Sequence, residues 1–295
     1  MLETLLSGQL LAAAVVSASL YALVGTGLNL VYGTVRLLNV AHGDFVMLGA
    51  YAVFWTQALL GWSPLAGAAL ASIAGAALGV LVYRGLFAKV LRNSLLAARL
   101  ESNSLLVFFG LSIVLQNLAS LAFSNNYRGY RYLDQVVTIG GASFAANRLV
   151  AAAIALAVLA LLLFVMARTL LGLGSQAVMQ HREAAAVSGV DVRAVYIFSF
   201  GAGFGMAALS GGLTSLFQQI HPFMGFEQTV AAFVVVMLGG LGRIHGGLAA
   251  AAILGVIETY GLVILGAGYR SLLLYGIFIA LLLLRPQGLF RPALR

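Results

Sequence analysis

Long apolar runs separated by short polar stretches dominate the chain. They occupy residues 9–32, 40–60, 63–83, 104–123 and 149–167, followed by 194–217, 229–241, 248–267 and 271–284. At about 1.5 Å of rise per residue, roughly 20 apolar residues cross the hydrocarbon core of a bilayer. The pattern predicts an all-α polytopic membrane protein with eight or nine membrane helices, including re-entrant or broken segments. The run at 229–241 is short, and the alternative is that it forms only half of a span.

Composition supports this class and excludes others. The 295 residues are 62% hydrophobic and 8% charged, whereas a soluble domain carries about 25% charged residues. The apolar runs are continuous, while a transmembrane β-barrel would alternate apolar and polar positions. Cysteine is absent, which excludes disulfides and thiolate sites. The four histidines are scattered without the spacing of metal ligands.

The basic residues predict which helix ends face the cytoplasm, because loops on that side are enriched in Lys and Arg. They gather in two loops and the tail: Arg84, Lys89, Arg92 and Arg99; Arg168, Arg182 and Arg193; and Arg285, Arg291 and Arg295. The net charge of +8 is therefore no sign of nucleic-acid binding. The loop 125–148 is predicted to be external, with Arg128 and Arg131 as exceptions. The N-terminus is outside if residues 40–60 cross fully, and inside if they dip in and return.

Polar residues gather just before the second run. Asn39, His42 and Asp44 flank Gly43. Asn39 or Asp44 is expected to cap a helix start, and Gly43 to permit an irregular backbone. Irregular backbone at membrane depth persists only when it is buried in protein or faces water. The cluster is therefore a structural re-entrant turn, or it borders a polar path where a helix N-terminus favours an anionic group.

Two further polar features lie in the C-terminal half. Gln218, His221 and Glu227 surround Pro222, and are interpreted as an external loop or as a broken helix that lines a pore. Glu258 stands alone in its apolar run. A charge at that depth costs about 2.5–3.5 kcal/mol on insertion scales, so it should face protein or water. A structural hydrogen bond and a role in transport both remain open for Glu258.

A polar loop at 174–192 interrupts the apolar pattern and is not needed to cross the membrane. Residues 175–188 are predicted to form one or two short helices, which Gly189 ends as a left-handed residue. The loop is interpreted as a docking site on the cytoplasmic face for another protein. Elsewhere, the pair Gly201 and Gly205 and the glycines at 239–247 predict close helix packing, with a flexible gate as the alternative. No clear tandem repeat is evident.

Three stretches resemble a known family. His-Arg-Glu-Ala-Ala-Ala-Val-Ser-Gly-Val at 181–190 resembles the Glu-Ala-Ala coupling loop of ATP-binding-cassette (ABC) importer permeases. Arg-Leu-Leu-Asn-Val-Ala-His-Gly-Asp-Phe-Val-Met-Leu-Gly-Ala-Tyr at 36–51 closely resembles the signature of branched-chain amino acid permeases. Gly-Gly-Leu-Gly-Arg-Ile-His-Gly-Gly-Leu from Gly239, with Ile257-Glu258, is similar to a third region of that family. The family often has a small residue and a proline where this chain has Arg243 and His245.

The resemblance implies one transmembrane permease domain over residues 1–295 in the bacterial inner membrane, with a coupling loop at 168–193. It also implies two cytosolic ATPase subunits, a second related permease subunit and an extracytoplasmic solute-binding protein. This chain would carry no cofactor, metal or catalytic residue, because ATP is bound by the partner subunits. The ATPase contact would comprise Arg182, Glu183, Ala184, Ala185 and Gly189, and the translocation path Asn39, His42, Asp44, Gln218, His221, Glu227 and Glu258.

The solute implied by the resemblance is leucine, isoleucine or valine, with urea, short-chain amides or other amino acids as alternatives. Two other classes of protein remain as competitors. A membrane-embedded enzyme would use His42 and Asp44 as acid and base, but no nucleophile converges on them. A secondary transporter driven by an ion gradient would need paired intramembrane acids, and the spans offer Glu258 as the one firm candidate.

Overall fold

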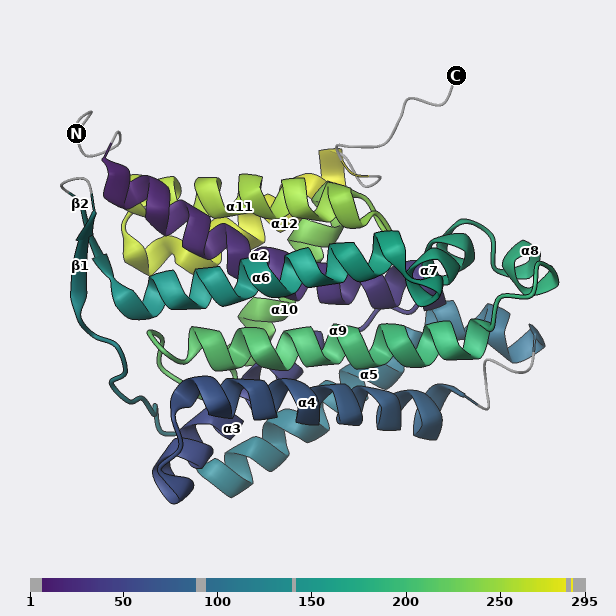
Figure 1. Ribbon diagram of the computed structural model, residues 1–295, viewed down its shortest axis with the longest axis horizontal. Helices are drawn as coiled ribbons and strands as arrows, with labels where there is room; N and C mark the ends of the chain where they lie inside the picture. Colours follow the sequence, from purple (N-terminus) through teal and green to yellow (C-terminus); the bar gives the residue numbers. More distant parts are fainter. Residues whose placement is uncertain (1–6, 89–93, 140–141, 285–287, 289–295) are drawn as a thin grey trace.

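The computed structural model describes residues 7–88, 94–139, 142–284 and 288 as an elongated helical bundle (Figure 1). Seven helices are long and apolar enough to cross a membrane, and two apolar helices are shorter, which confirms the all-α polytopic prediction. The eleven helices in the described part are α2 (Gly8–Val35), α3 (His42–Leu60), α4 (Pro64–Val82), α5 (Ser94–Phe123), α6 (Ala146–Arg168), α7 (Leu170–Gln180), α8 (Arg182–Val187), α9 (Val192–Thr214), α10 (Met224–Gly239), α11 (Ile244–Leu265) and α12 (Arg270–Leu284).

The two ends of the bundle differ. Helix α8 projects from one end, the α8 end, while an antiparallel pair of strands, β1 (Val136–Ile139) and β2 (Ala142–Ala145), lies at the other, the hairpin end (Figure 1). The hairpin was not anticipated from the sequence. It lies beside the start of α2, where Gln9 Nε2 donates to the Ser143 carbonyl at 2.7 Å. Helix α2 therefore starts at the end of the bundle opposite α8.

Basic residues occur at both ends. The α8 end carries Arg84, Arg168, Arg182 and Arg193, whereas Lys89, Arg92, Arg285, Arg291 and Arg295 lie outside the described residues. At the hairpin end, Arg128 is held locally. Its Nη2 donates to the Phe123 carbonyl at 2.9 Å, and its Cζ lies 5.2 Å from the centre of the Trp55 ring. These contacts give a structural reason for a basic residue in a loop that was predicted to be external.

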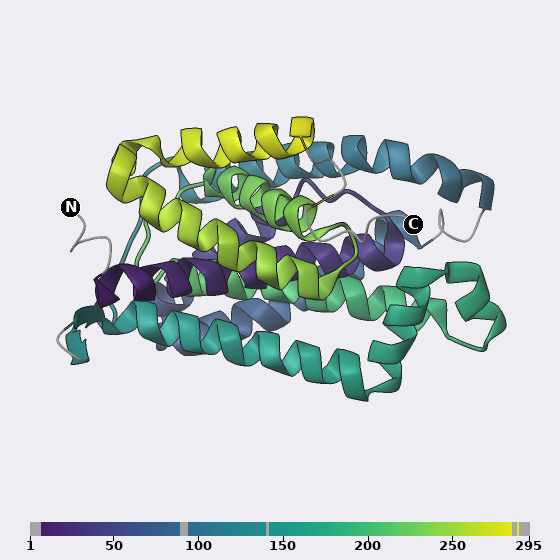
Figure 2. The ribbon, with the colours of Figure 1, turned by 90° about the horizontal axis from the view of Figure 1, so that it is seen from above.

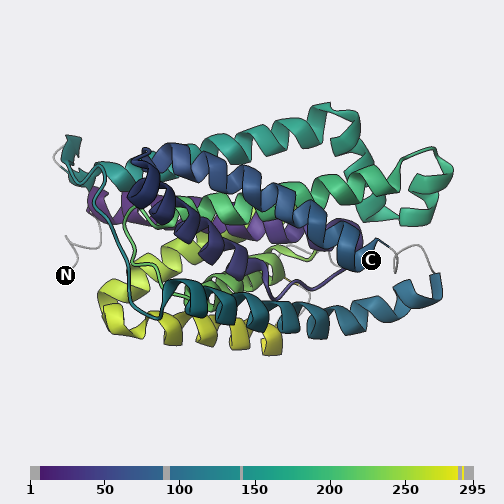
Figure 3. The same ribbon diagram turned by 90° about the horizontal axis from the view of Figure 1, so that it is seen from below.

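Two helices begin inside the bundle instead of at its surface. After α2, residues 36–41 fold back as a non-helical segment that ends in a turn. Helix α3 then starts at the level of the middle of α9, where the ring centres of His42 and Phe204 are 6.1 Å apart (Figure 3). Helix α10 starts beside it, because Gly225 contacts Gly43. From there α3 runs to the hairpin end and α10 to the α8 end. The short run at 229–241 is thus part of a half-length helix, and α3 forms a second broken crossing.

The same order of three helices occurs twice: a long helix, then a helix that starts inside the bundle, then another long helix. In the first half, α2, α3 and α4 follow one another; in the second half, α9, α10 and α11 do so with opposite direction. The halves interlock, since α4 packs on α9 and α11 packs on α2. Figure 2 shows α2 lying between α11 and α6. This inverted repeat of structure was not evident in the sequence.

Glycine permits the close contacts in this core. A Cβ atom on Gly203 would lie 2.7 Å from the Gly27 carbonyl oxygen, so α2 and α9 cross almost backbone to backbone. Gly205 faces α4: a Cβ atom on Gly205 would lie 3.1 Å from the Ser72 carbonyl oxygen. Gly201 also faces α4, which confirms that the pair mediates helix packing. The turn between α10 and α11 is equally tight, because Gly240 and Gly242 both have positive φ.

The α2–α9 crossing can be tested with Gly203→Ala. The added methyl would overlap the Gly27 carbonyl oxygen and Val31 Cγ2, both at 2.7 Å. We expect a loss of about 1–3 kcal/mol of stability, the usual cost of overpacking. The matched control is Gly201→Ala, whose Cβ would come no closer than 3.4 Å, to Val80. Thermal unfolding in detergent should separate the two variants; equal midpoints would contradict the close crossing.

Candidate functional site

The polar loop at the α8 end folds into two capped helices. Thr169 Oγ1 accepts from the Gly172 N–H at 3.1 Å and starts α7. His181 Nδ1 accepts from the Ala184 N–H at 3.2 Å and starts α8. Helix α8 ends at Ser188, and Gly189 follows with φ of 86°, as the sequence predicted. Local capping therefore specifies this segment before any tertiary contact is considered.

Helix α8 exposes nearly all of its surface. Ala185 is the exception at 5% exposure, because it packs into a cluster with Val178 and Val195 that anchors α8 to α7 and α9. Arg182 lies over the Tyr196 ring, with Cζ 5.6 Å from the ring centre. The exposed residues form what we call the α8 surface: Arg182, Glu183, Ala184, Ala186, Val187 and Gly189. Val187 is apolar yet 90% exposed.

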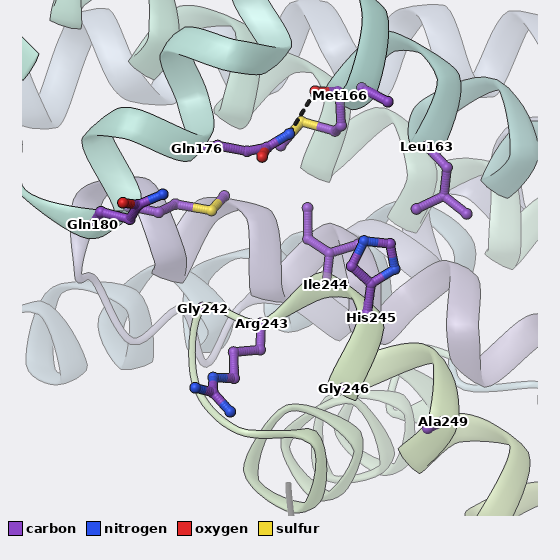
Figure 4. A pocket seen from close by; sticks show the side chains of 12 residues that line it. Leu163, Met166, Gln176, Gln180, Gly242, Arg243, Ile244, His245, Gly246 and Ala249 are labelled. Atoms are coloured by element: carbon purple, nitrogen blue, oxygen red, sulfur yellow. Dashed lines mark hydrogen bonds between the residues drawn. The ribbon is translucent and has the colours of Figure 1, made fainter. Parts of the chain in front are cut away.

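A cavity of about 590 Å³ separates α7 from the turn between α10 and α11 (Figure 4). Leu163 and Met166 of α6 form its apolar side, Gln176 and Gln180 project from α7, and His245 faces them from the start of α11. The turn itself is fixed to α2 by Asn29, whose Nδ2 donates to the Arg243 carbonyl and whose Oδ1 accepts from the Gly242 N–H, each at 2.7 Å.

The polar cluster before α3 lies at the centre of the bundle and is fully enclosed. Asn39, His42 and Asp44 are each at most 1% exposed. His42 Nε2 donates to the Val24 carbonyl at 3.1 Å, and Asp44 Oδ1 accepts from Gln116 Nε2 at 2.9 Å. Among the described residues, both polar atoms of the Asn39 side chain, His42 Nδ1 and Asp44 Oδ2 have no hydrogen-bond partner. His42 and Asp44 bond to different helices, α2 and α5, so they form no acid–base pair.

The expected caps of α3 were wrong. Neither Asn39 nor Asp44 caps the helix, since Ala41 occupies the N-cap position without a side-chain bond. The hydroxyl of Thr229, on α10, does so instead: Oγ1 accepts from the Gly43 N–H at 2.9 Å and lies 3.1 Å from the Val40 carbonyl. Gly43 is helical, and its lack of a side chain is required by contact with Gly225 and not by irregular backbone.

A second cavity, of about 310 Å³, opens at the hairpin end and receives two of the predicted path residues, Gln218 and Glu258. Glu258 has a partner that the sequence could not name. Arg270 Nε donates to Glu258 Oε1 at 2.6 Å, and Arg270 Nη2 donates to the Tyr21 hydroxyl at 3.3 Å. The Glu258 side chain is 4% exposed, so this ion pair neutralises a charge at membrane depth.

The other two predicted path residues lie apart from that cavity. The loop between α9 and α10 is held at the hairpin end by Ile220, which exchanges backbone hydrogen bonds with Arg128 at 2.8 and 2.9 Å. His221 lies against the Tyr127 ring, and burial lowers its pKa, which the Glu227 carboxylate only partly opposes. Glu227 accepts a hydrogen bond from Ser271 Oγ at 3.1 Å.

The family comparison decides the class. The model of the branched-chain amino acid transport system permease component matches residues 10–282. The chain belongs to this permease family. It is 28% identical to the high-affinity branched-chain amino acid transport system permease protein LivH of Escherichia coli strain K12, over 93% of this chain and 92% of LivH. The LivH protein of Salmonella typhimurium is 30% identical over the same shares. The permease protein LivM of Escherichia coli strain K12 is 28% identical over 94% of this chain and 69% of LivM.

No solved structure matches the chain. Family membership places the chain among ABC transport permeases, which are multi-pass membrane proteins and not enzymes. Permeases of this family carry no cofactor, because partner ATPases handle ATP. The enclosed positions of His42 and Asp44, which bond to separate elements, agree with a protein that performs no acid–base chemistry.

The Thr229 cap can be tested by Thr229→Val, which keeps the shape and removes the hydroxyl. The Gly43 N–H would then be buried without a partner, at a cost of about 1–3 kcal/mol. We expect a lower unfolding midpoint in detergent for this permease variant. Thr229→Ser is the control, because it keeps Oγ in place and should unfold close to the wild-type temperature. If both variants match the wild type, the hydroxyl does not hold the two helix starts together.

Proposed function

We propose that this permease is the pore-forming subunit of a binding-protein-dependent ABC importer in the bacterial inner membrane. Its solutes are the branched-chain amino acids leucine, isoleucine and valine. The observation that carries the solute assignment is the similarity, over nearly the full chain, to permeases named for branched-chain amino acid transport. The scarcity of charged groups in the spans fits a permease whose solute affinity lies in a separate binding protein.

The proposed drive comes from ATPase subunits that dock on the α8 surface. Three observations support this: α8 projects from the bundle, it is anchored through Ala185, and it exposes Glu183 and Val187. Closure of the ATPases would push α8 and α7 together as one lever, because Val178 of α7 packs in the same cluster as Ala185. The 590 Å³ cavity next to α7 gives that lever room to move. Ala185 serves as the anchor of this lever, while the exposed residues make the contact.

The partners follow from the same proposal. Two ATPase subunits engage two coupling helices, so a second permease chain completes the pore. The similarity of this chain to both LivH and LivM, two permease proteins of one organism, favours a related but different second chain. An extracytoplasmic binding protein delivers the solute to the hairpin end, opposite α8. By this arrangement the hairpin and the loop between α9 and α10 are extracytoplasmic.

The proposed path begins in the cavity of Gln218 and Glu258 and passes toward the centre of the bundle. Gln228 lines that cavity and precedes Thr229, so the cavity reaches the start of α10. There the unpartnered polar atoms of Asn39 and Asp44 are the groups available to a passing polar solute when α3 and α10 separate. In the described conformation the contact between Gly43 and Gly225 keeps this route closed. His221 and Glu227 border it at the hairpin end.

The coupling proposal is tested by Glu183→Lys in the assembled complex. Reversing a charge at a protein contact costs several kcal/mol, so we expect leucine uptake to fall roughly tenfold or more while ATP hydrolysis continues. Uptake and hydrolysis should be measured together in proteoliposomes. The control is Glu183→Asp, which keeps the negative charge at the same position of α8 and should preserve uptake. Unchanged uptake with Glu183→Lys would refute docking through α8.

A further inference from the structure

The cavity at the hairpin end is lined by both apolar and polar side chains. Leu10, Val16 and Leu262 contribute apolar surface from α2 and α11. Arg148, from the start of α6, and the carboxamides of Gln218 and Gln228 are among its polar groups. Its volume of about 310 Å³ lies in the range of small-molecule sites. Apolar surface with a few polar groups is the usual composition of a site that orients a small ligand.

The charges in this cavity do not balance. Arg270 is committed to Glu258 and Tyr21, so that pair contributes no net charge. Arg148 has no such partner: its Cζ lies 5.4 Å from the centre of the Phe217 ring, and among the described residues its guanidinium has no hydrogen bond or ion pair. One positive charge therefore remains, at a position that also lines two neighbouring cavities of the hairpin end.

We propose that this cavity is an entry site for a zwitterionic amino acid with an apolar side chain, and that Arg148 binds the α-carboxylate. The inference rests on the proposed import of branched-chain amino acids and adds the group that recognises them in the permease. A guanidinium matches a carboxylate with two parallel hydrogen bonds. The apolar residues that α2 and α11 contribute receive the side chain of the solute.

The remaining polar groups suit the ammonium of the same ligand. Gln218 and Gln228 each present a carboxamide, whose oxygen accepts from an ammonium and whose nitrogen donates to a carboxylate. Glu258, on α11, adds a carboxylate to the cavity while it holds Arg270. Urea and neutral amides lack a carboxylate and would leave Arg148 without its partner. The site therefore favours amino acids over those solutes.

The test compares L-leucine with L-leucinamide, which keeps the ammonium and lacks the carboxylate. Binding of radiolabelled leucine to the assembled complex without its binding protein is measured first, with leucinamide as competitor. We expect Arg148→Gln to weaken leucine binding roughly tenfold or more, since a hydrogen-bonded charge pair is lost. We also expect the preference for leucine over leucinamide to disappear in Arg148→Gln, a result that a merely structural role would not produce. Arg148→Lys should retain part of the preference.

The matched control is Arg131→Gln, which removes the same charge at the hairpin end from a side chain that is 95% exposed. It should bind leucine as the wild type does. Equal competition by leucine and leucinamide in the wild type would overturn the site, and so would leucine binding that Arg148→Gln leaves unchanged. Loss of co-purified anionic lipid in Arg148→Gln, with leucine binding intact, would assign the arginine to lipid instead. If the wild-type complex takes up no leucine in proteoliposomes, the proposed function itself fails, before any variant is compared.

Discussion

The starts of α3 and α10 meet inside the bundle, and the hydroxyl of Thr229 connects them. Helix starts leave backbone N–H groups without intrahelical partners, and in a membrane such groups need a partner from the protein. Thr229 supplies one for α3, and the glycines at 43 and 225 allow the two helices to touch. Because both helices begin here, this contact fixes where each broken crossing turns and how the two halves of the chain interlock.

Small side chains also determine how the helices around that centre pack. Apolar burial gives little force between helices in lipid, so contact area and backbone approach decide their packing. Gly27 and Gly203 bring α2 and α9 together, and Asn29 ties the turn between α10 and α11 to α2. The result is a closely packed centre with cavities at both ends.

The functional features divide between those ends. The α8 surface is small, capped and anchored, which are properties of a lever that transmits force without unfolding. At the hairpin end, three arginines make different contacts. Arg128 fastens a loop and Arg270 neutralises Glu258, while Arg148 retains its charge in a cavity.

Apolar run length by itself determined the class of protein, nearly all the membrane helices and the short run of α10, because a span needs about 20 apolar residues. Local signals likewise determined α7, α8 and the left-handed Gly189, since helix caps act within a few residues. Only the tertiary structure decided that α3 begins inside the bundle, that Thr229 caps it, and that Arg270 pairs with Glu258. These contacts join residues 186 and 12 positions apart, and one sequence does not specify which of its polar side chains will meet across helices. The hairpin and the inverted repeat escaped prediction for the same reason: pairing and interlocking are properties of the packed chain.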